Sequence, residues 1–301
     1  MSDAPALVDA HHHVWDLTRR PQPWLDVPAH TPINRSFGLG DLRDAARRPI
    51  AGRRLTATVA VQCVASVDET RELLALADAD PLVGAVVGWA DLSSPAIGDV
   101  LDELRQGPGG RYLRALRHLV QDETDPDWLQ RPDVDRGLRT LQERGLAYDV
   151  LIRTHQFRQA IRLAQHLPGL PLVLDHAGKP PVGRPGLAEW ERMVRTLAGH
   201  AQVRCKLSGL ITEADQGKWT LADIRPVWDV LLTAFGPERL MFGSDWPVCV
   251  LAGGWSRWAV TVDELLHGCS PSDTEAVLNA TAADFYDLRH TKTKEAPLPC
   301  S

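Results

Sequence analysis

The chain has 301 residues, of which 44% are hydrophobic and 24% charged, a balance that argues against disorder and leaves ample material for a core. Its formal net charge is -6 and its arginines are scattered, so no basic surface for nucleic acid or an anionic membrane is expected. The five cysteines are widely spaced without a C-x-x-C pair, which argues against a disulfide framework and a thiolate zinc site.

The first stretch, "MSDAPAL", has no basic region followed by a long apolar run. Nowhere in the chain do about eighteen consecutive apolar residues occur, which is the length that a membrane helix requires. We therefore expect a cytoplasmic protein that does not bind a membrane.

The first predicted strand lies in "LVDAHHHVWD", residues 7–16. A proline-rich segment follows, "RRPQPWLD" and "PAHTPINRSFG", and it is longer than most connections between elements. Long ordered loops of this kind are usually lids or binding loops. We expect this one to contribute to a functional site.

Short apolar strands then alternate with amphipathic helices through the rest of the chain. The further strands are predicted at 56–63, 82–90, 112–120, 147–152, 170–176, 202–209 and 239–245. The helices are predicted at 68–79, 94–106, 132–144, 156–166, 186–198, 219–235, 258–267 and 271–285, with Ser66 or Asp68 and Ser272 as start signals.

Eight strand and helix units, with nearly continuous apolar strands, favour an α/β fold of the (β/α)8 TIM barrel type over an open sheet. No linker divides the chain, so we expect a single barrel domain over residues 1–289. The remaining residues, 290–301, have no periodicity and are predicted to form a frayed tail.

The three adjacent histidines of the first strand raise the question of which of them act together. A histidine run near a terminus can be a purification tag, but this one lies between the apolar pairs Leu7-Val8 and Val14-Trp15. Side chains alternate along a strand, so His11 and His13 are predicted to share a face with Asp9 while His12 points away. Two of the three imidazoles can then meet one ion.

Polar residues close nearly every predicted strand, at the end where TIM barrels place their active sites. No G-x-S-x-G elbow, H-E-x-x-H motif or phosphate-binding glycine loop is present, and Ser244 is a poor candidate nucleophile. The strand-end set is His11, His13, Gln62, Trp89, Asp91, Arg117, His118, Arg153, His155, Asp175, His176, Lys206, Ser208, Ser244 and Asp245.

Part of this set is typical of a metal site. Two imidazoles at i and i+2, a third from a later strand and a carboxylate from the last strand are ligands that borderline divalent ions accept, with zinc first. A single strand-end histidine is more often an ordinary satisfied polar group, so a metal site requires several of these side chains to converge. His11, His13 and Asp245 are expected to hold the ion, and His176 to be a further ligand or to hydrogen-bond the attacking water.

Five motifs in order, "DAHHHVWD", "LRHLVQDETDP", "VLDHAGKPP", "KLSGLITEAD" and "ERLMFGSDWPVC", resemble the amidohydrolase superfamily. Within it they resemble the lactonase branch, which includes L-fuconolactonases, L-rhamnonolactonases and pyrone-dicarboxylate lactonases, and the resemblance covers residues 7 to about 288. It implies a barrel of the metal-dependent hydrolase type that opens a cyclic ester. It also implies a first-strand pair on His11 and His13, a sixth-strand ligand on His176, and Asp245 as general base.

One departure from the wider superfamily concerns the number of metal ions. Binuclear members carry a bridging lysine or glutamate on the fourth or fifth strand, and "LRALRHLV" and "AYDVLI" offer neither. At most one divalent ion is therefore expected, with His155 as a reserve ligand. The branch also includes members that work without metal, so a metal-free site stays open.

The expected reaction is addition of water to a lactone carbonyl. Asp245 would take the proton from water and return it to the leaving ring oxygen. Arg117, His118 or His176 would stabilise the oxyanion.

A small uncharged aldonolactone is the expected substrate, because only Arg117 and Arg153 could clamp a dicarboxylate. Further substrate contacts are expected from Trp15, Trp24, Trp246, His118, His155 and Lys206.

Two other functions fit the same residues. The first is a metal-dependent decarboxylase on the same scaffold, and the second is a barrel that binds sugar acids without catalysis. We expect a monomer or a homodimer whose partner is a small molecule and not nucleic acid.

Overall fold

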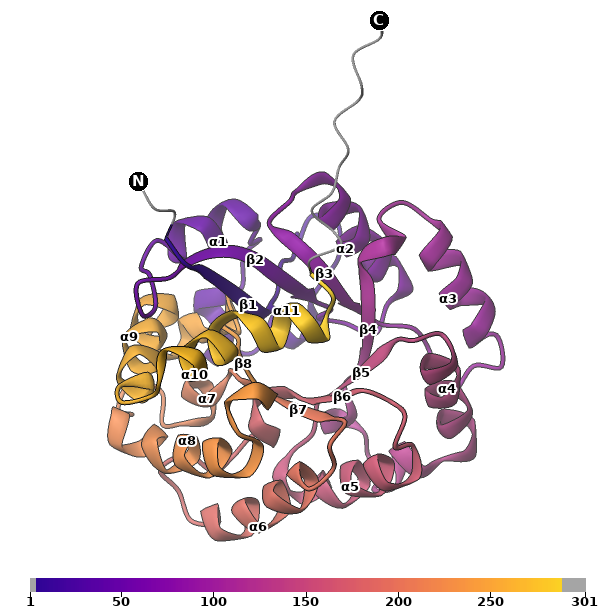
Figure 1. Ribbon diagram of the computed structural model, residues 1–301. Coiled ribbons are helices and arrows are strands. Elements are labelled where there is room, and N and C mark those ends of the chain that lie inside the picture. Colours follow the sequence, from indigo (N-terminus) through magenta and orange to yellow (C-terminus); the bar gives the residue numbers. More distant parts are fainter. Residues whose placement is uncertain (1–3, 289–301) are drawn as a thin grey trace, which may run out of the picture.

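A computed structural model describes residues 4–288 of the chain (Figure 1). Eight strands form one sheet in which every neighbouring pair is parallel and the order follows the sequence. The strands are β1 Ala6–His12, β2 Arg54–Val61, β3 Val83–Gly88, β4 Leu113–His118, β5 Ala147–Val150, β6 Leu172–Leu174, β7 Val203–Leu207 and β8 Leu240–Phe242.

The sheet closes on itself between β1 and β8. His12 pairs with Trp246 in a parallel bridge, His13 N donates to Trp246 O over 2.7 Å, and Asp245 N donates to His11 O over 2.9 Å. These contacts join the end of the first strand to the segment after the last. The expected (β/α)8 TIM barrel is confirmed, and the predicted tail at 290–301 lies outside the described residues.

The helices surround the barrel, and each predicted helix is present (Figure 1). The last one is divided into α10 Pro271–Glu275, a π-helical stretch Ala276–Ala280 and α11 Thr281–Phe285. The sequence did not predict α1 Leu39–Ala45 or α7 Leu210–Glu213. The predicted helices are α2 Val67–Ala79, α3 Ile97–Gln106, α4 Pro132–Glu143, α5 Phe157–His166, α6 Leu187–Ala198, α8 Leu221–Phe235, α9 Gly254–Leu266, α10 Pro271–Glu275 and α11 Thr281–Phe285.

Capping residues explain where two of these helices begin. The Ser66 side chain accepts a hydrogen bond from Glu69 N, so this predicted start signal of α2 is the N-cap. The start of α10 differs from the prediction, because Ser270 and not Ser272 is the N-cap. Ser270 Oγ accepts from Asp273 N, and Pro271 takes the first helical position, where its missing N–H costs nothing.

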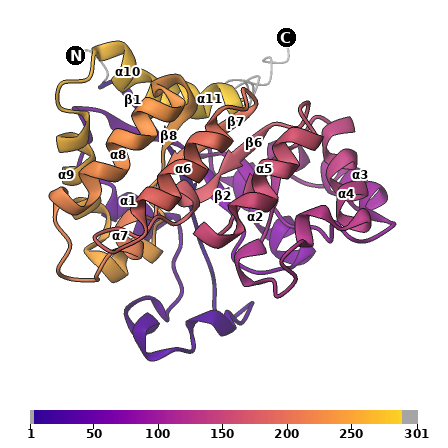
Figure 2. The same ribbon diagram turned by 90° about the horizontal axis from the view of Figure 1, so that it is seen from below.

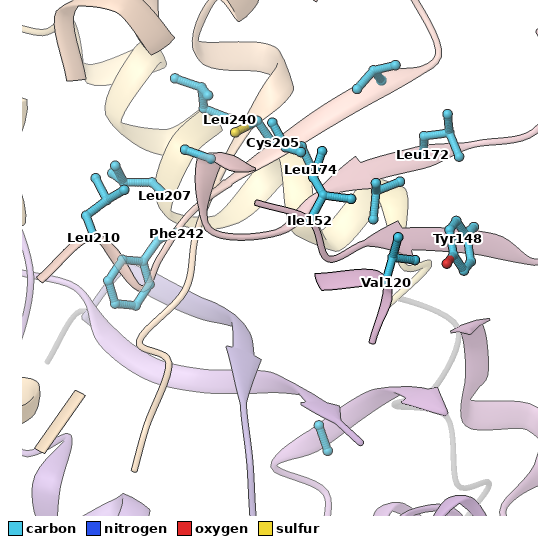
Figure 3. Packing of buried hydrophobic residues seen from close by; sticks show 14 of the residues in the cluster. Val120, Tyr148, Ile152, Leu172, Leu174, Cys205, Leu207, Leu210, Leu240 and Phe242 are labelled. Atoms are coloured by element: carbon cyan, nitrogen blue, oxygen red, sulfur yellow. The ribbon is translucent and has the colours of Figure 1, made fainter. Parts of the chain in front are cut away.

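Alternation along the strands divides the buried side chains into two layers. Leu172, Leu174, Leu240 and Phe242 belong to the larger cluster of packed apolar residues (Figure 3). The residues between them on the strands belong to a second cluster, which lies inside the barrel and includes Val173 and Met241. Most side chains of this cluster are small. Residues of α11 and of the segment that follows it complete the cluster. Figure 1 shows α11 lying across one end of the barrel.

The long connection after β1 folds onto itself and extends from the body of the barrel (Figure 2). It contains two short turns of 3-10 helix, Pro23–Leu25 and Pro28–Ile33. Trp15 ties its two ends together, since its backbone pairs with Phe37 and its indole N–H donates to Arg35 O over 2.6 Å. In residues 4–288, no helix combines the length and the apolar character that crossing a membrane requires.

Candidate active site

Four side chains from three regions of the chain converge at the carboxyl end of the barrel. His11 and His13 come from β1 and the residue after it, His176 follows β6, and Asp245 follows β8. The Nε2 atoms of His11 and His13 lie 3.2 Å apart. Asp245 Oδ1 lies 3.8 Å from Nε2 of His11, 3.6 Å from Nε2 of His13 and 3.9 Å from Nε2 of His176. All four side chains are buried.

A bulge in β1 directs the first histidine into the barrel. The pairing with β2 slips by one residue between Asp9 and His12, so the simple alternation expected of this strand is interrupted. Asp9 therefore does not join the histidines. Its carboxylate accepts hydrogen bonds from His11 N at 3.1 Å, Ser244 N at 2.8 Å and Ser244 Oγ at 2.6 Å, and so ties β1 to the end of β8.

His12 points away from the other two imidazoles, as predicted. Its Nε2 lies 2.9 Å from Thr58 Oγ1, and the ring is fully buried. Burial lowers the pKa of His12 to about 3 because the protonated ring would lose its hydration. His12 is therefore a neutral packing residue.

The backbone at two of the four residues is left-handed. His176 has a φ of 51° and Asp245 a φ of 54°, values that residues other than glycine rarely adopt. Ala177, after His176, is also left-handed with a φ of 52°. Such conformations cost about 1–3 kcal/mol each and concentrate at functional sites, where they direct a side chain.

Contacts behind the histidines set which ring nitrogen faces the site. His13 Nδ1 lies 2.8 Å from Val61 O, and because a carbonyl only accepts, this nitrogen carries the proton. The Nε2 of His13 is then the ring nitrogen that faces the site. His176 Nδ1 lies 2.9 Å from Ser208 Oγ, which leaves its Nε2 directed at Asp245.

Burial and neighbouring charges set the protonation of the group. Burial lowers the pKa values of His11 and His176, so both rings are neutral at neutral pH. Burial alone would raise the pKa of Asp245, but the adjacent His176 and His13 outweigh it and hold the pKa below its ordinary value. The site therefore presents the neutral rings of His11 and His176 beside an ionised carboxylate.

The donor set fits one divalent ion. Zinc accepts imidazole nitrogen and carboxylate oxygen in a tetrahedron, in which neighbouring ligand atoms lie about 3.3 Å apart. His11, His13 and Asp245 offer ligand atoms within 4.8 Å of one another, and so do His11, Asp175 and His176. The two groups share His11, so buried groups that could hold a metal lie where the sequence places them.

An ionic cluster lies beneath these ligands, inside the barrel. Arg117 Nη1 lies 3.1 Å from Asp175 Oδ2 and 3.4 Å from His11 Nε2, and Nη2 donates to Gln62 O. Lys206 Nζ lies 2.5 Å from Asp149 Oδ2 and 3.0 Å from Asp175 Oδ1. Burial acts to raise the pKa of Asp175, but Lys206, His11 and Arg117 hold it well below the usual range.

A cavity of about 550 Å³ opens above the four converging side chains. Its floor includes Arg117, and its walls come from the loops after the strands, including the long connection after β1. The lining residues are His13, Pro23, Trp24, His30, Cys63, Val64, Ala65, Arg117, Leu119, Gln121, Asp122, Leu151, Arg153, His176, Lys179, Thr212, Glu213, Gln216, Asp245, Val248 and Leu251.

Some predicted substrate contacts line this cavity and others lie elsewhere. Trp24 lines it, whereas Trp15 and Trp246 are buried in the packing beside it, where both contact Phe37. Lys206 lies below the cavity floor and has no exposed surface.

Two predicted histidines also lie outside the cavity lining. His118 stacks on Trp128 with ring centroids 4.0 Å apart, and its Nε2 lies 2.6 Å from Glu123 Oε1. His155, the reserve ligand, lies in the 3-10 turn Thr154–Gln156 and joins neither group of candidate ligands.

Sequence reasoning did not select several cavity residues as contacts. The most prominent are Lys179 and Glu213, whose Nζ and Oε1 lie 3.1 Å apart on the wall. Both are in motifs already noted, "VLDHAGKPP" and "KLSGLITEAD", but they follow the strand ends by several residues. Attention to loop residues inside the motifs would have found them.

The fold and the four converging side chains define a barrel hydrolase of the amidohydrolase type. The chain belongs to the amidohydrolase family, whose model matches residues 8–288.

Similar proteins include two L-fucono-1,5-lactonases. The one from Burkholderia multivorans is 37% identical, with 93% of this chain and 96% of that protein covered. The one from Burkholderia ambifaria is 33% identical, with 93% of this chain and 95% of that protein covered. A crystal structure of a Burkholderia multivorans amidohydrolase with bound zinc is 36% identical and superposes with a TM-score of 0.85, covering 94% of this chain and 99% of that one.

Proposed function

We propose that this protein hydrolyses a lactone, with an aldonolactone as substrate and Asp245 as general base. The observation that carries the proposal is the position of Asp245 Oδ1, which lies 3.6–3.9 Å from three imidazole Nε2 atoms at the floor of the cavity. The similarity to two L-fucono-1,5-lactonases over most of the chain supports the same reaction class.

Asp245 is suited to accept a proton from water. Its side chain is 6% exposed at the cavity floor, and its pKa lies below the ordinary value, so it is ionised at neutral pH. In the proposed reaction it takes the proton as water adds to the ester carbonyl. It then returns the proton to the ring oxygen as the carbon–oxygen bond of the lactone breaks.

His11, His13 and Asp245 would hold one divalent ion, with His176 as a fourth ligand or as a partner of the attacking water. Such an ion, with zinc as first choice, would polarise an ester carbonyl and lower the pKa of a bound water to about 7. Whatever occupies this position, the residues of the chain orient the reacting groups. The fixed ring of His13 and the left-handed backbone of His176 and Asp245 keep their side chains directed at the same point.

Arg117 is the proposed electrostatic partner of the oxyanion. It lines the cavity, and Asp175 and the carbonyl of Gln62 hold its guanidinium rigidly. A preorganised cation in a buried site stabilises developing negative charge without reorganising during the reaction.

The charges on the cavity wall favour an uncharged polyhydroxylated substrate. Lys179 is paired with Glu213, and Arg153 lies 3.7 Å from Asp122. A dicarboxylate would meet both acids, whereas sugar hydroxyls can donate to the carboxylates and accept from the cations. Trp24 adds an apolar surface for one face of a lactone ring.

The two other functions make different predictions. A decarboxylase would release carbon dioxide from a carboxylated substrate, and a binding protein would hold sugar acids without turning them over. Product analysis separates the first from a lactonase. Catalysis of any aldonolactone opening excludes the second.

The test is a pH-indicator assay with L-fucono-1,5-lactone and a panel of other aldonolactones, on the protein as purified, after chelation, and after zinc is restored. One proton should be released for each lactone consumed. Loss on chelation and recovery with zinc would support the metal, while activity that survives complete metal removal would reject the metal but keep the lactonase. Failure to open any lactone would reject the proposed function.

A further inference from the structure

We propose that Lys206 is a positioning residue, which holds the imidazole of His11 in place from inside the barrel and makes no contact with the substrate. The inference goes beyond the proposed function, although one of its two measurements rests on it.

Lys206 is the central cation of a closed cluster. Its side chain has no exposed surface, and its Nζ lies 2.5 Å from Asp149 Oδ2, 3.0 Å from Asp175 Oδ1 and 3.2 Å from His11 Nδ1. The ammonium donates a hydrogen bond to Asp149, forms an ion pair with Asp175, and contacts the Nδ1 edge of the His11 ring. The lysine cannot reach the cavity without leaving all three of these partners.

Charge balance explains why a lysine is needed at this depth. Asp149 and Asp175 are both fully buried, and an unpaired buried carboxylate is very costly. Lys206 and Arg117 supply two positive charges to match them. The Tyr286 hydroxyl donates to Asp149 Oδ1 over 3.0 Å, so the carboxylate oxygen that Lys206 does not contact has a partner as well.

The contact with His11 gives this cluster a role in the active site. Nδ1 of His11 lies between Lys206 Nζ at 3.2 Å and Asp175 Oδ1 at 3.4 Å, while Nε2 lies 3.2 Å from Nε2 of His13. The ring therefore has one edge held by the cluster and the other edge in the site. A ring rotation that moved Nε2 out of the site would also break the contacts of Nδ1.

The same strand supports a second ligand. Ser208, two residues after Lys206, follows β7, and its hydroxyl contacts Nδ1 of His176. Neither residue lines the cavity. The end of β7 thus supports two of the three imidazoles from behind, and contacts of this kind typically change metal affinity or activity 10- to 100-fold when removed.

The test must separate positioning from charge balance, because Lys206→Met alone leaves a buried carboxylate unpaired and is expected to unfold readily. The charge-matched variant Lys206→Met/Asp149→Asn removes one charge of each sign. Tyr286→Phe is the control, since it removes a hydrogen bond to Asp149 without touching His11. Zinc affinity, measured by competition with a chromophoric chelator, thermal stability, and kcat and KM for the lactone are compared.

We expect the double variant to melt close to the wild type and yet to bind zinc about 10- to 100-fold more weakly, with a similar loss in kcat and little change in KM. Tyr286→Phe should keep zinc affinity and kcat within about twofold. A double variant with wild-type zinc affinity and kcat would overturn the proposal.

Lys206→Arg provides a second route if the double variant does not fold. It keeps the charge, but a planar guanidinium cannot take the place of a compact ammonium among Asp149, Asp175 and His11. Zinc affinity or kcat should fall about tenfold, and no change in either would overturn the proposal.

If the wild type bound zinc without opening lactones, the proposed function would fail and zinc affinity would still decide the role of Lys206. If the wild type opened lactones without zinc, kcat would decide the role of Lys206.

Discussion

The hydroxyl of Ser208 lies 2.9 Å from Nδ1 of His176, and both residues are buried where β7 and β6 end. The contact holds the imidazole by the nitrogen that faces away from the site, and so leaves Nε2 3.9 Å from Asp245 Oδ1. A small side chain on one strand thus determines the direction of a larger one on its neighbour.

Ser208→Ala should therefore weaken the site without unfolding the protein. The change leaves Nδ1 of His176 without this partner and removes one hydroxyl, so we expect about a tenfold loss in zinc affinity or kcat. Thermal melting should shift little, since a net hydrogen bond contributes about 1 kcal/mol. Ser208→Thr, which keeps the hydroxyl, is the matched control, and equal zinc affinity and kcat in Ser208→Ala and wild type would contradict the prediction.

Asp245→Asn should abolish most of the activity. The amide cannot accept a proton from water, and losing a general base typically costs about 10²–10⁴ in rate. Stability should change little, because the replacement has nearly the same shape. Kinetics with the lactone that gives the highest rate provide the measurement.

The control for this variant is Asp229→Asn, an exposed residue of α8 far from the cavity lining. It should retain the wild-type rate. A rate for Asp245→Asn within about tenfold of wild type would mean that another group activates the water.

Glu213→Gln should affect substrate binding more than chemistry. Its carboxylate lies on the cavity wall beside Lys179 and is the proposed acceptor for substrate hydroxyls. A hydrogen bond to a charged group is worth about 1.5–3 kcal/mol, so KM should rise about tenfold or more while kcat stays within about threefold. Glu191→Gln, on the outer surface of α6, should leave both parameters unchanged. A fall in kcat at constant KM would place Glu213 in the chemistry instead.

Sequence reasoning found the barrel and the convergence of the four central residues for a physical reason. Parallel strands that are buried on both faces appear in the sequence as apolar runs, and their carboxyl ends must meet at one end of a barrel. His11, His13, His176 and Asp245 all lie at or just after such ends. Their meeting could therefore be predicted before any coordinates.

The positions of Asp9 and Lys206 could not be predicted, because they depend on features that the pattern of a single strand does not show. The bulge in β1 separates Asp9 from the histidines, and its position depends on pairing with β2. Lys206 was expected at the substrate, but the alternation of β7 alone does not say how deep in the barrel a strand residue lies. Its depth follows from Asp149 on β5 and Asp175 directly after β6, two buried carboxylates that require a buried cation.

The stability of the folded protein should depend on pH in part because of His12. The pKa of this buried ring is about 3 in the folded protein, against about 6.5 in an unfolded chain. As the pH falls below about 6.5, the unfolded chain takes up a proton at this residue and the folded protein does not. Stability is therefore lost between about pH 6.5 and 3, with a slope of about 1.4 kcal/mol per pH unit from this group.

His12→Gln isolates this contribution from those of the other buried histidines, because glutamine does not titrate and can still reach Thr58. Unfolding by urea is measured for both proteins, stripped of metal, between pH 7.5 and 5. The wild type should lose stability more steeply than the variant by about 1.4 kcal/mol per pH unit below pH 6. Parallel pH profiles would show that His12 takes up its proton equally in the folded and unfolded states.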